Sequence, residues 1–432
     1  MSQHLFRVFP NEPMPEYVSK ADGLYIYTQN GQKYLDTTAG STSYAILGWS
    51  HPEVIASMQA QLARFCHMDY KFWANEQTEQ LADLLLANAE NRLSRVYFAG
   101  NSGAEACEAA MKMSFQSHQA LGHRDKNWFI SRKQSYHGAT TDAMALSERP
   151  NLEFYKPLWP HNRARISQHH PFHEMHPGET LSDYSQRCAE ELEQKILHIG
   201  AHKVAGFVAE TMMGGLVGDV PPAPDYWKNI RAVCDRYQVH LILDEVYCGS
   251  GSSGKMFCCD WDGITPDFLF ISKTLAAGFA PMNAVFTTNA VYQSIQQGQG
   301  RLQHTTTHQA YSLGVAAALA VQTIVQQPEM LAHIRELGQY MRTTLTDELQ
   351  ESPFYADVRG RGLRFSFEYR CQNQDAFGLK LSHIMKEKHH ILISGKWHRV
   401  CFTPAFIMTH EEADRVLDTF IDTYHHVAND WK

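Results

Sequence analysis

Two apolar runs that end in charged residues constrain this chain more than any other feature. Leu241–Leu243 is unbroken and ends at Asp244 and Glu245, and Phe268–Ile271 ends at Ser272-Lys273. Runs of this kind are typical of strands buried on both faces. Because open α/β sheets bind ligands at the carboxyl ends of their strands, both runs indicate a ligand-binding edge.

The charged ends carry specific chemistry if the two strands are neighbours. Asp244 and Lys273 would then line one crevice, where a buried lysine is costly unless it is paired or chemically used. An acid facing a pyridinium nitrogen and a lysine that forms a Schiff base are the two groups that pyridoxal phosphate needs from its protein. The alternative is that both residues only end their strands and meet solvent.

The motifs around these residues resemble the class III aminotransferases, the ω-amino-acid type. The resemblance rests on Asp244–Gly254, Pro266-Asp267, Lys273 and Gly278–Pro281, which follow one another in the family's order. It extends from about residue 20 to the C-terminus. It implies an α/β enzyme of pyridoxal phosphate fold type I, in which Lys273, Asp244 and Glu210 are catalytic. Glu210 would lie close to the lysine and to substrate groups.

The order of strands and helices predicts how the chain is organised. The two alternate between residues 95 and 285, which favours a mostly parallel sheet with helical crossovers. The resemblance adds a large cofactor-binding domain at 51–310 and a smaller α+β domain built from 1–50 and 311–432. Residues 1–20 are expected to form an irregular arm, followed by a hairpin over 24–36 with a type I′ turn at Asn30-Gly31.

A turn of small residues at 100–106 opens a predicted helix and is a candidate phosphate site. Free backbone N–H groups and the positive end of the helix dipole would face an anion there. The resemblance assigns the phosphate contacts to Ser102, Gly103 and Ala104. The alternative is an ordinary helix start that Ser102 caps.

The resemblance implies further contacts to the cofactor. Tyr136 would stack on the pyridine ring, which fixes the ring plane, and His137 and Val246 would lie beside it. Thr307 would reach the phosphate from the neighbouring subunit, with Thr305 and Thr306 as alternative registers. Each active site would then need two chains, so a homodimer or a dimer-based tetramer is expected.

Candidate substrate contacts follow from the same resemblance and from departures from it. Tyr44, Trp49 and Trp73 suggest an aromatic entrance. Ser394 and Ser253 occupy positions where many relatives carry an arginine. The candidate replacements that could bind an acidic substrate group are Arg364, Lys396 and Arg399.

Two other patterns suggest different ligands, and we expect neither. Gly249–Lys255 has the spacing of a nucleotide-binding loop, but Met256 stands where magnesium needs a hydroxyl. Residues 150–180 are rich in proline and histidine, and a metal site is suggested by His169, His170, His173, Glu174 and His176. Since His173 and His176 lack the spacing that places two histidines on one helix face, we expect a solvated surface loop and no metal.

Composition narrows the cellular setting. A net charge of −8 gives no reason to expect nucleic acid or an acidic membrane as a partner. We find neither an apolar run long enough to span a membrane nor a signal peptide. The nine cysteines are scattered apart from Cys258-Cys259, which favours a reducing cytoplasm over a disulfide framework.

The predicted function is therefore amino-group transfer with pyridoxal phosphate, from an amine or (ω-)amino acid to a 2-oxo acid in two ping-pong halves. An aminomutase, decarboxylase, epimerase or lyase would use the same Lys273 and Asp244, so these reactions stay open. A non-catalytic protein that retains the fold is a further alternative. A nicotinamide dehydrogenase is disfavoured because no Gly-x-Gly-x-x-Gly follows an early strand.

Overall fold

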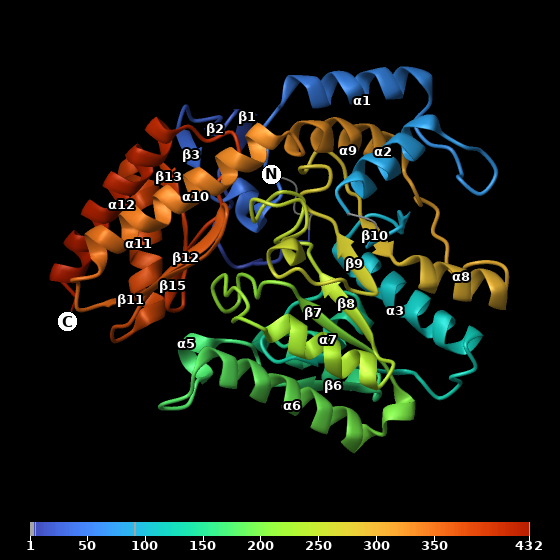
Figure 1. Ribbon diagram of the computed structural model, residues 1–432. Helices are drawn as coiled ribbons and strands as arrows, with labels where there is room; N and C mark the ends of the chain where they lie inside the picture. The colour runs from blue at the N-terminus through green and yellow to red at the C-terminus, as the bar shows by residue number, and fades with distance from the viewer. Residues whose placement is uncertain (1–3, 5, 90–91, 432) are drawn as a thin grey trace.

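The computed structural model describes residues 4, 6–89 and 92–431. A large sheet with helices on both faces occupies one part of the molecule, and two smaller sheets with three long helices occupy the other (Figure 1). Residues 1–3 and 5 of the predicted arm lie outside the described residues. The arm ends earlier than predicted, because the first strand begins at Val18.

The central sheet has seven strands in the order β4-β10-β9-β8-β7-β5-β6. β10 runs opposite to the other six strands of this sheet, so the predicted mostly parallel sheet is confirmed. The strands are β4 (Arg95–Tyr97), β5 (Trp128–Arg132), β6 (Arg163–Ile166), β7 (Val204–Glu210), β8 (His240–Asp244), β9 (Phe268–Ile271) and β10 (Ala284–Thr287).

The alternation of side chains along β8 separates the two faces of this sheet. Leu241 and Leu243 pack in the cluster that includes helix α7, whereas Ile242 packs in the cluster that includes helix α3. Successive strand residues point to opposite faces, so Asp244 lies on the α3 face and Glu245 on the other. The helices around this sheet are α1 (Pro52–Arg64), α2 (Glu76–Ala87), α3 (Gly103–Ala120), α4 (Thr141–Leu146), α5 (Pro171–Glu174), α6 (Leu181–Ile199), α7 (Tyr226–Arg236), α8 (Asn289–Gly298) and α9 (Ser312–Val325).

Both ends of the chain build the smaller part. One sheet has the order β1-β2-β3-β13 and the other β11-β12-β15-β14. β13 pairs in parallel with β3, so a strand from the C-terminal region extends the N-terminal hairpin. The elements are β1 (Val18–Asp22), β2 (Tyr25–Thr28), β3 (Lys33–Asp36), β11 (Tyr355–Arg361), β12 (Arg364–Tyr369), β13 (Ile391–Leu392), β14 (Ser394–Lys396), β15 (Arg399–Phe402), α10 (Pro328–Leu349), α11 (Gln374–His389) and α12 (His410–Asn429). The residue limits proposed for the domains stay a prediction.

Local sequence explains where several of these helices begin. Ser102, Thr180 and Thr409 each cap a helix, and a carboxylate three residues later returns the hydrogen bond to the cap. Pro52 and Pro328 occupy the first position of α1 and α10, where the missing N–H has no helical partner to lose. Four further short helical turns lie at Ala39–Ser43, Pro150–Leu158, Ala201–Lys203 and Cys258–Trp261.

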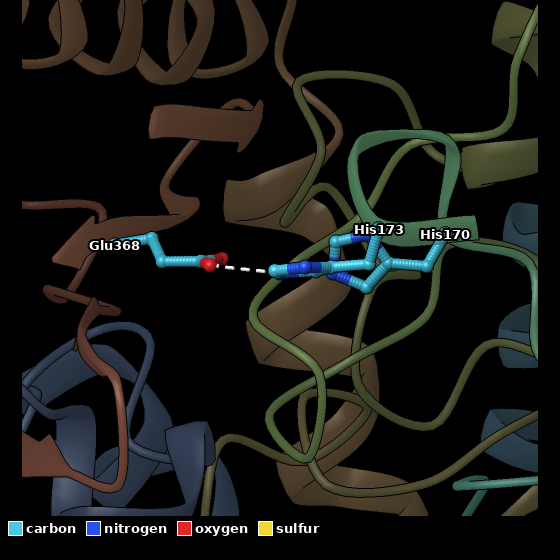
Figure 2. A group of neighbouring side chains, drawn as sticks. All are labelled: His170, His173 and Glu368. Carbon is cyan, nitrogen blue, oxygen red and sulfur yellow. Dashed lines mark hydrogen bonds and ion pairs between the residues drawn. The ribbon is translucent and has the colours of Figure 1, made fainter. Parts of the chain in front are cut away.

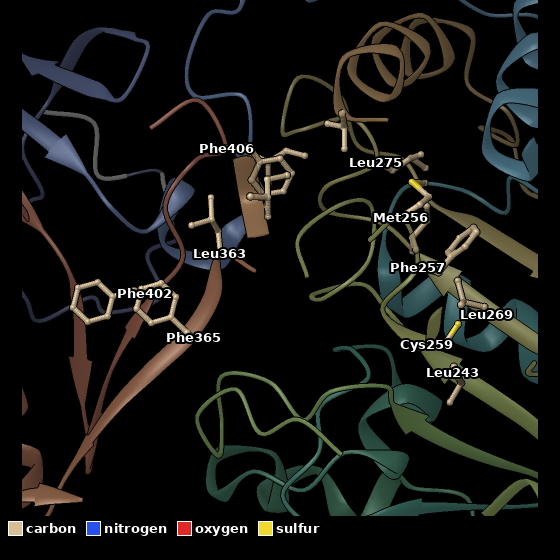
Figure 3. Close-up of a cluster of buried hydrophobic side chains, with 14 of the residues drawn as sticks. Leu243, Met256, Phe257, Cys259, Leu269, Leu275, Leu363, Phe365, Phe402 and Phe406 are labelled. Atoms are coloured by element: carbon tan, nitrogen blue, oxygen red, sulfur yellow. The ribbon is translucent and has the colours of Figure 1, made fainter. Parts of the chain in front are cut away.

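A shared core joins the two parts. One cluster of buried hydrophobic side chains contains Leu243 and Leu269 of the central sheet together with Phe365 and Phe402 of the C-terminal sheet (Figure 3). The rings of Phe365 and Phe402 stack with centroids 5.3 Å apart. Among the described residues, no helix is long and apolar enough to cross a membrane.

The N-terminal hairpin forms, but its turn differs from the prediction. Thr28 donates its N–H to the carbonyl of Gln32 at 3.0 Å and closes a loop of three residues. Gly31 has φ +87°, whereas Asn30 does not adopt a positive φ. A type I′ turn needs positive φ at both central residues, so the predicted two-residue turn is wrong. The longer loop with glycine in the left-handed region is the next most common hairpin connection.

The predicted surface excursion over 150–180 is wrong in part. Residues Arg163–Ile166 form the edge strand β6, which pairs in parallel with β5. His169 and His170 are buried, each with 1% of its surface exposed. The segment therefore belongs to the body of the protein rather than to a solvated loop.

Candidate active site

The carboxyl ends of β7, β8 and β9 meet at a cavity of about 840 Å³. Glu210, Asp244 and Lys273 all line this cavity. β8 lies between β7 and β9 and is parallel to both. The structure therefore brings together the three residues that the sequence placed at strand ends.

Lys273 lies in a mostly buried position two residues after β9. Burial lowers its pKa to about 8, and the nearby Asp244 carboxylate acts in the opposite direction. Its Nζ is 5.7 Å from the centre of the Tyr247 ring. The preceding Ser272 donates its hydroxyl to the Met282 carbonyl at 2.8 Å, which anchors the backbone at this point. At pH 8 roughly half of this amine would be unprotonated, against well under a hundredth of an ordinary lysine.

Asp244 is held by two hydrogen bonds at the end of β8. Oδ2 is 2.8 Å from Nδ1 of His137, and Oδ1 accepts the N–H of Val246 at 3.0 Å. The carboxylate is 4% exposed. These contacts fix its orientation at the cavity wall, as an acid that must face one ring atom requires.

Glu245, the next residue, has a different environment although both carboxylates follow the same apolar run. It accepts hydrogen bonds from the N–H groups of Cys258 at 2.7 Å and Cys259 at 2.8 Å, and from the Thr211 hydroxyl at 2.9 Å. Burial raises its pKa to about 7, and the two N–H donors oppose this rise. Glu245 does not line the cavity, so we assign it a structural role.

The N-terminus of α3 forms one wall of the cavity. The Ser102 hydroxyl accepts from the N–H of Glu105 at 3.3 Å, and the Glu105 carboxylate accepts from the N–H groups of Asn101 at 2.7 Å and Ser102 at 2.9 Å. In the described part of the chain, the N–H groups of Gly103 and Ala104 have no hydrogen bond of their own. Ser102 is thus the helix cap of the alternative interpretation, and two further amides remain available for an anion.

Close packing fixes this wall against its neighbours. A Cβ at Gly103 would lie 2.8 Å from Cγ2 of Val246, and one at Gly138 would lie 2.4 Å from the Ala104 Cβ. Gly138 also has φ +140°, which side chains rarely tolerate. The helix start, the Tyr136–Gly138 segment and the segment after β8 are therefore held in a fixed relation.

Tyr136 lines the cavity next to an arginine that the sequence analysis did not identify. The Arg149 guanidinium is 4.0 Å from the centre of the Tyr136 ring and also lines the cavity. Arg149 has no ion pair with any described residue, and its Nε is buried without a hydrogen-bond partner. Burial lowers its pKa, whereas Tyr136 and Glu210 act in the opposite direction. No motif surrounds Arg149, so no local signal could have indicated it.

Glu210 ends β7 and is buried in the cavity wall. Burial raises its pKa to about 7, while His137 lowers it and Asp244 raises it. Its backbone carbonyl accepts a hydrogen bond from the Arg132 guanidinium. A carboxyl group in this state can be either protonated or charged near neutral pH, which suits it to contact a polar substrate group.

Of the predicted substrate contacts, Tyr44 and Lys396 line the cavity. Ser394, where many relatives carry an arginine, lines it as well. Trp49 does not, and instead packs edge-on against Tyr44 with ring centroids 6.1 Å apart. Trp73 is 64% exposed and does not line this cavity.

Arg364 and Arg399 are fully buried and do not line the cavity, contrary to the prediction. Arg364 donates to the carbonyls of Ser43 at 3.1 Å and Tyr247 at 3.3 Å. Arg399 donates to the carbonyl of Gly215. Both side chains therefore hold segments of the cavity wall from behind. Ser253 is also buried and outside the cavity.

Thr307 lies on the surface, outside the cavity of its own chain. Its carbonyl is 2.9 Å from Nε2 of His67. The competing hydroxyls have partners, since Thr306 donates to the Ala99 carbonyl at 2.8 Å and Thr305 to the Gln309 side chain at 3.2 Å. Of the three threonines, Thr307 is the one whose hydroxyl has no hydrogen bond within the described chain.

The family of this chain is evident from comparison with known proteins. The class-III aminotransferase family matches residues 9–424. A gamma aminobutyrate transaminase 2 of Solanum lycopersicum is 33% identical over 427 residues, which cover 94% of this chain and 90% of that protein. An uncharacterized aminotransferase of Schizosaccharomyces pombe is 32% identical over 436 residues, which cover 97% of this chain and 94% of that protein.

Solved structures agree with this assignment. The omega transaminase of Pseudomonas jessenii in complex with PMP has a TM-score of 0.91 and 28% identity, over 96% of this chain and 94% of its own. The PMP-bound aminotransferase of Vibrio fluvialis has a TM-score of 0.90 and 26% identity, over 97% of this chain and 94% of its own.

The residues of the cavity fit pyridoxal phosphate, which this family uses. The free N–H groups at the start of α3 suit its phosphate, the oriented Asp244 suits its ring nitrogen, and the largely desolvated Lys273 suits its aldehyde. The predicted transamination is confirmed, and nothing found supports the alternative reactions on the same scaffold. The chain is therefore a class III aminotransferase, a pyridoxal-phosphate-dependent enzyme that moves an amino group from an amine or amino acid to a 2-oxo acid.

Proposed function

We propose specific roles for the residues of the cavity. Bound pyridoxal phosphate supplies an electron-accepting ring. Lys273 would hold the aldehyde of the cofactor, and its freed Nζ would move the proton from the carbon that carries the substrate amino group. Asp244 would face the ring nitrogen and keep it protonated. The observation that carries this proposal is the meeting of Asp244, Lys273 and the α3 N-terminus at one cavity.

We further propose that the amino donor carries an acidic group, as in an ω-amino acid. Arg149 and Lys396 are the cations that line the cavity besides Lys273 among the described residues. The Arg149 charge is partly buried without an ion pair, so a substrate carboxylate would restore the pairing that the protein leaves open. The relatives that are gamma aminobutyrate transaminases support this substrate class.

A matched pair of amines tests this substrate class. 4-Aminobutyrate and butylamine differ only by a carboxylate in place of a methyl group. With pyruvate as acceptor, the proposal expects a kcat/KM for 4-aminobutyrate that is roughly 10²-fold higher, as one charge-assisted contact allows. Equal kcat/KM values for the two amines, measured with pyruvate and again with 2-oxoglutarate as acceptor, would contradict the proposed substrate class.

Replacing Arg149 by alanine should remove most of this discrimination. We expect kcat/KM for 4-aminobutyrate to fall roughly 10- to 100-fold, because a hydrogen bond to a charged group contributes about 1.5–3 kcal/mol. The rate with butylamine is the internal control and should change by less than about threefold. Since Arg149 also packs on Tyr136, cofactor absorbance must be measured. An equal fall in kcat/KM for both amines would show that Arg149 only supports the Tyr136 ring.

We propose that the enzyme is a homodimer with shared active sites. Large apolar side chains are exposed on one stretch of the chain, among them Leu62 at 58%, Phe72 at 76% and Trp73 at 64%. A surface of this kind is typical of a protein interface. The loop between α1 and α2, which carries Phe72 and Trp73, lies at the edge of the molecule (Figure 1). The hydrogen bond between His67 and Thr307 joins this stretch to the candidate phosphate contact.

Replacing Thr307 by alanine tests the shared site. The dissociation constant for pyridoxal phosphate should rise roughly 10- to 100-fold, because a hydrogen bond to a charged group is lost. The dimer, measured by light scattering, should persist. Thr305→Ala is the matched control, since the Thr305 hydroxyl is bonded to Gln309. A monomer with full cofactor affinity would contradict the proposal. If only Thr305→Ala weakened cofactor binding, the phosphate contact would be assigned to Thr305 instead of Thr307.

We also propose that the enzyme acts in the cytoplasm. All nine cysteines are free thiols, which supports a reducing compartment. A tagged protein that localises to another compartment would contradict this proposal.

A further inference from the structure

We propose that His170, His173 and Glu368 form a binding site for a divalent transition metal of the zinc type, apart from the cofactor cavity. His170 and His173 belong to the segment that contains α5, and Glu368 comes from β12 (Figure 2). One ligand atom from each lies within 4.8 Å of the others. None of the three lines the cofactor cavity.

His170 is the observation that indicates a missing ligand. It is 1% exposed, and neither ring nitrogen makes a hydrogen bond of ordinary geometry in the described chain. Buried polar groups are rarely left without a partner. The Val217 backbone lies close to the ring, but neither nitrogen is bonded to it with ordinary hydrogen-bond geometry. The buried ring therefore keeps its nitrogens available for a further ligand.

His173 and Glu368 complete the ligand set. Nε2 of His173 is 2.8 Å from Oε1 of Glu368, and the rings of His170 and His173 have centroids 4.2 Å apart. Two imidazoles and one carboxylate are a common ligand set for zinc and related ions. Tetrahedral ligands lie roughly 3.3 Å apart, so only small side-chain rotations are needed. The His173 side chain is 34% exposed, which gives an entry path and room for a water as fourth ligand.

Arg359 is the main competitor for Glu368 and must be accommodated. Its Nη2 lies 2.6 Å from Oε2 of Glu368, and its Nη1 lies 3.1 Å from Asp357. The other oxygen, Oε1, faces His173. The Arg359 charge holds Oε2 through an ion pair, whereas that oxygen makes no hydrogen bond of ordinary geometry. Arg359 therefore fits the role of an orienting cation beside the free oxygen, and its charge is shared with Asp357.

The nearest further groups are consistent with a metal at this place. His398 lies 4.0 Å from Oε2 of Glu368, the oxygen that faces away from His173. Arg359 also donates to the Val217 carbonyl at 2.9 Å. A metal here would join the α5 segment to β12, close to the loop that supplies Gly215 to the cofactor cavity.

The sequence indicates only the two histidines of this site, and the expectation of no metal rests on local spacing. The carboxylate, Glu368, lies 195 residues after His173 and only the fold brings it there. His176, which the sequence grouped with the other histidines, is exposed and not part of the set. It therefore offers a matched control.

The test measures metal content of the untagged holoenzyme. Protein is treated with a chelator, incubated with excess Zn²⁺ and desalted, and bound zinc is counted by mass spectrometry. We expect one zinc per chain for the wild type and for His176→Ala, and a near-complete loss for His173→Ala. Zn²⁺ should also raise the melting temperature of the wild type but not of His173→Ala.

Three outcomes would overturn the proposal. One is a wild type that retains no zinc, and the second is a His173→Ala variant that retains as much as the wild type. The third is an equal loss in His176→Ala, which would indicate binding by scattered surface histidines. Cofactor absorbance reports whether His173→Ala is folded, and Glu368→Gln gives a second variant that removes a ligand. Because the readout is zinc content, the result is independent of the amino donor and of the roles proposed for Lys273 and Arg149.

Discussion

Lys273→Ala is expected to reduce amino-group transfer by at least about 10⁴-fold, the upper end of what a positioned acid–base group contributes. The variant loses both the amine that holds the aldehyde and the group that moves the proton. The visible absorbance of the lysine-linked cofactor should disappear. Each half-reaction should be measured separately, by rapid mixing of the loaded enzyme with amine and then with 2-oxo acid.

Lys133→Ala is the matched control for this loss, because Lys133 is exposed and follows β5 outside the cavity. It should keep wild-type absorbance and rate. An added small primary amine should restore part of the activity of Lys273→Ala, since it can supply a base to the emptied space. Turnover of Lys273→Ala within about tenfold of the wild type would remove Lys273 from its assigned role.

Asp244→Asn should retain cofactor and lose rate. Asparagine keeps the shape of the side chain but not the charge that holds a proton on the ring nitrogen. Removing one member of a buried charge pair costs about 3–5 kcal/mol, which corresponds to a loss of about 10²- to 10⁴-fold if it falls on the transition state. The half-reaction rate with 4-aminobutyrate is the measurement.

Glu245→Gln provides an unusually close control for Asp244→Asn. The two residues are adjacent, but Glu245 bonds the backbone of Cys258 and Cys259 and not the cavity. We expect Glu245→Gln to lower the melting temperature and to leave the half-reaction rate within about threefold of the wild type. If Glu245→Gln lost rate and Asp244→Asn did not, the assignment of Asp244 as the acid that keeps the ring nitrogen protonated would be wrong.

The sequence predicted the centre of the fold well because a simple physical signal marks it. Strands buried on both faces must be continuously apolar, so Leu241–Leu243 and Phe268–Ile271 are visible without any tertiary information. The charged residues at their ends are equally visible, because nothing in a buried strand explains them. Edge strand β6 carries no such signal: its sequence is Arg-Ala-Arg-Ile, and only its pairing with β5 makes it a strand.

The arginines show where sequence reasoning failed at the site. Arg364 and Arg399 follow strand patterns that are compatible with a cavity, but distant carbonyls at Ser43, Tyr247 and Gly215 take up their donors. These hydrogen bonds join residues that are more than a hundred positions apart in the sequence, so local patterns cannot predict them. Arg149 differs from these two arginines because its side chain does face the cavity. It lies between α4 and a short helical turn, where no sequence pattern marks it, and it packs on the Tyr136 ring. Side-chain partners, rather than residue type, decided which cations face the cavity.

The pairing of β13 with β3 has a consequence for how the enzyme matures. The N–H of Leu35 donates to the carbonyl of His390 at 2.8 Å, and the N–H of Phe406 donates to Ile46 at 2.7 Å. Contacts of such long sequence separation form slowly and cannot form before both segments exist. On the ribosome, the first fifty residues must wait for nearly all of the chain to be synthesised. Tyr44 and Ser394 both line the catalytic cavity. The cavity is therefore among the last parts of the newly synthesised protein to fold.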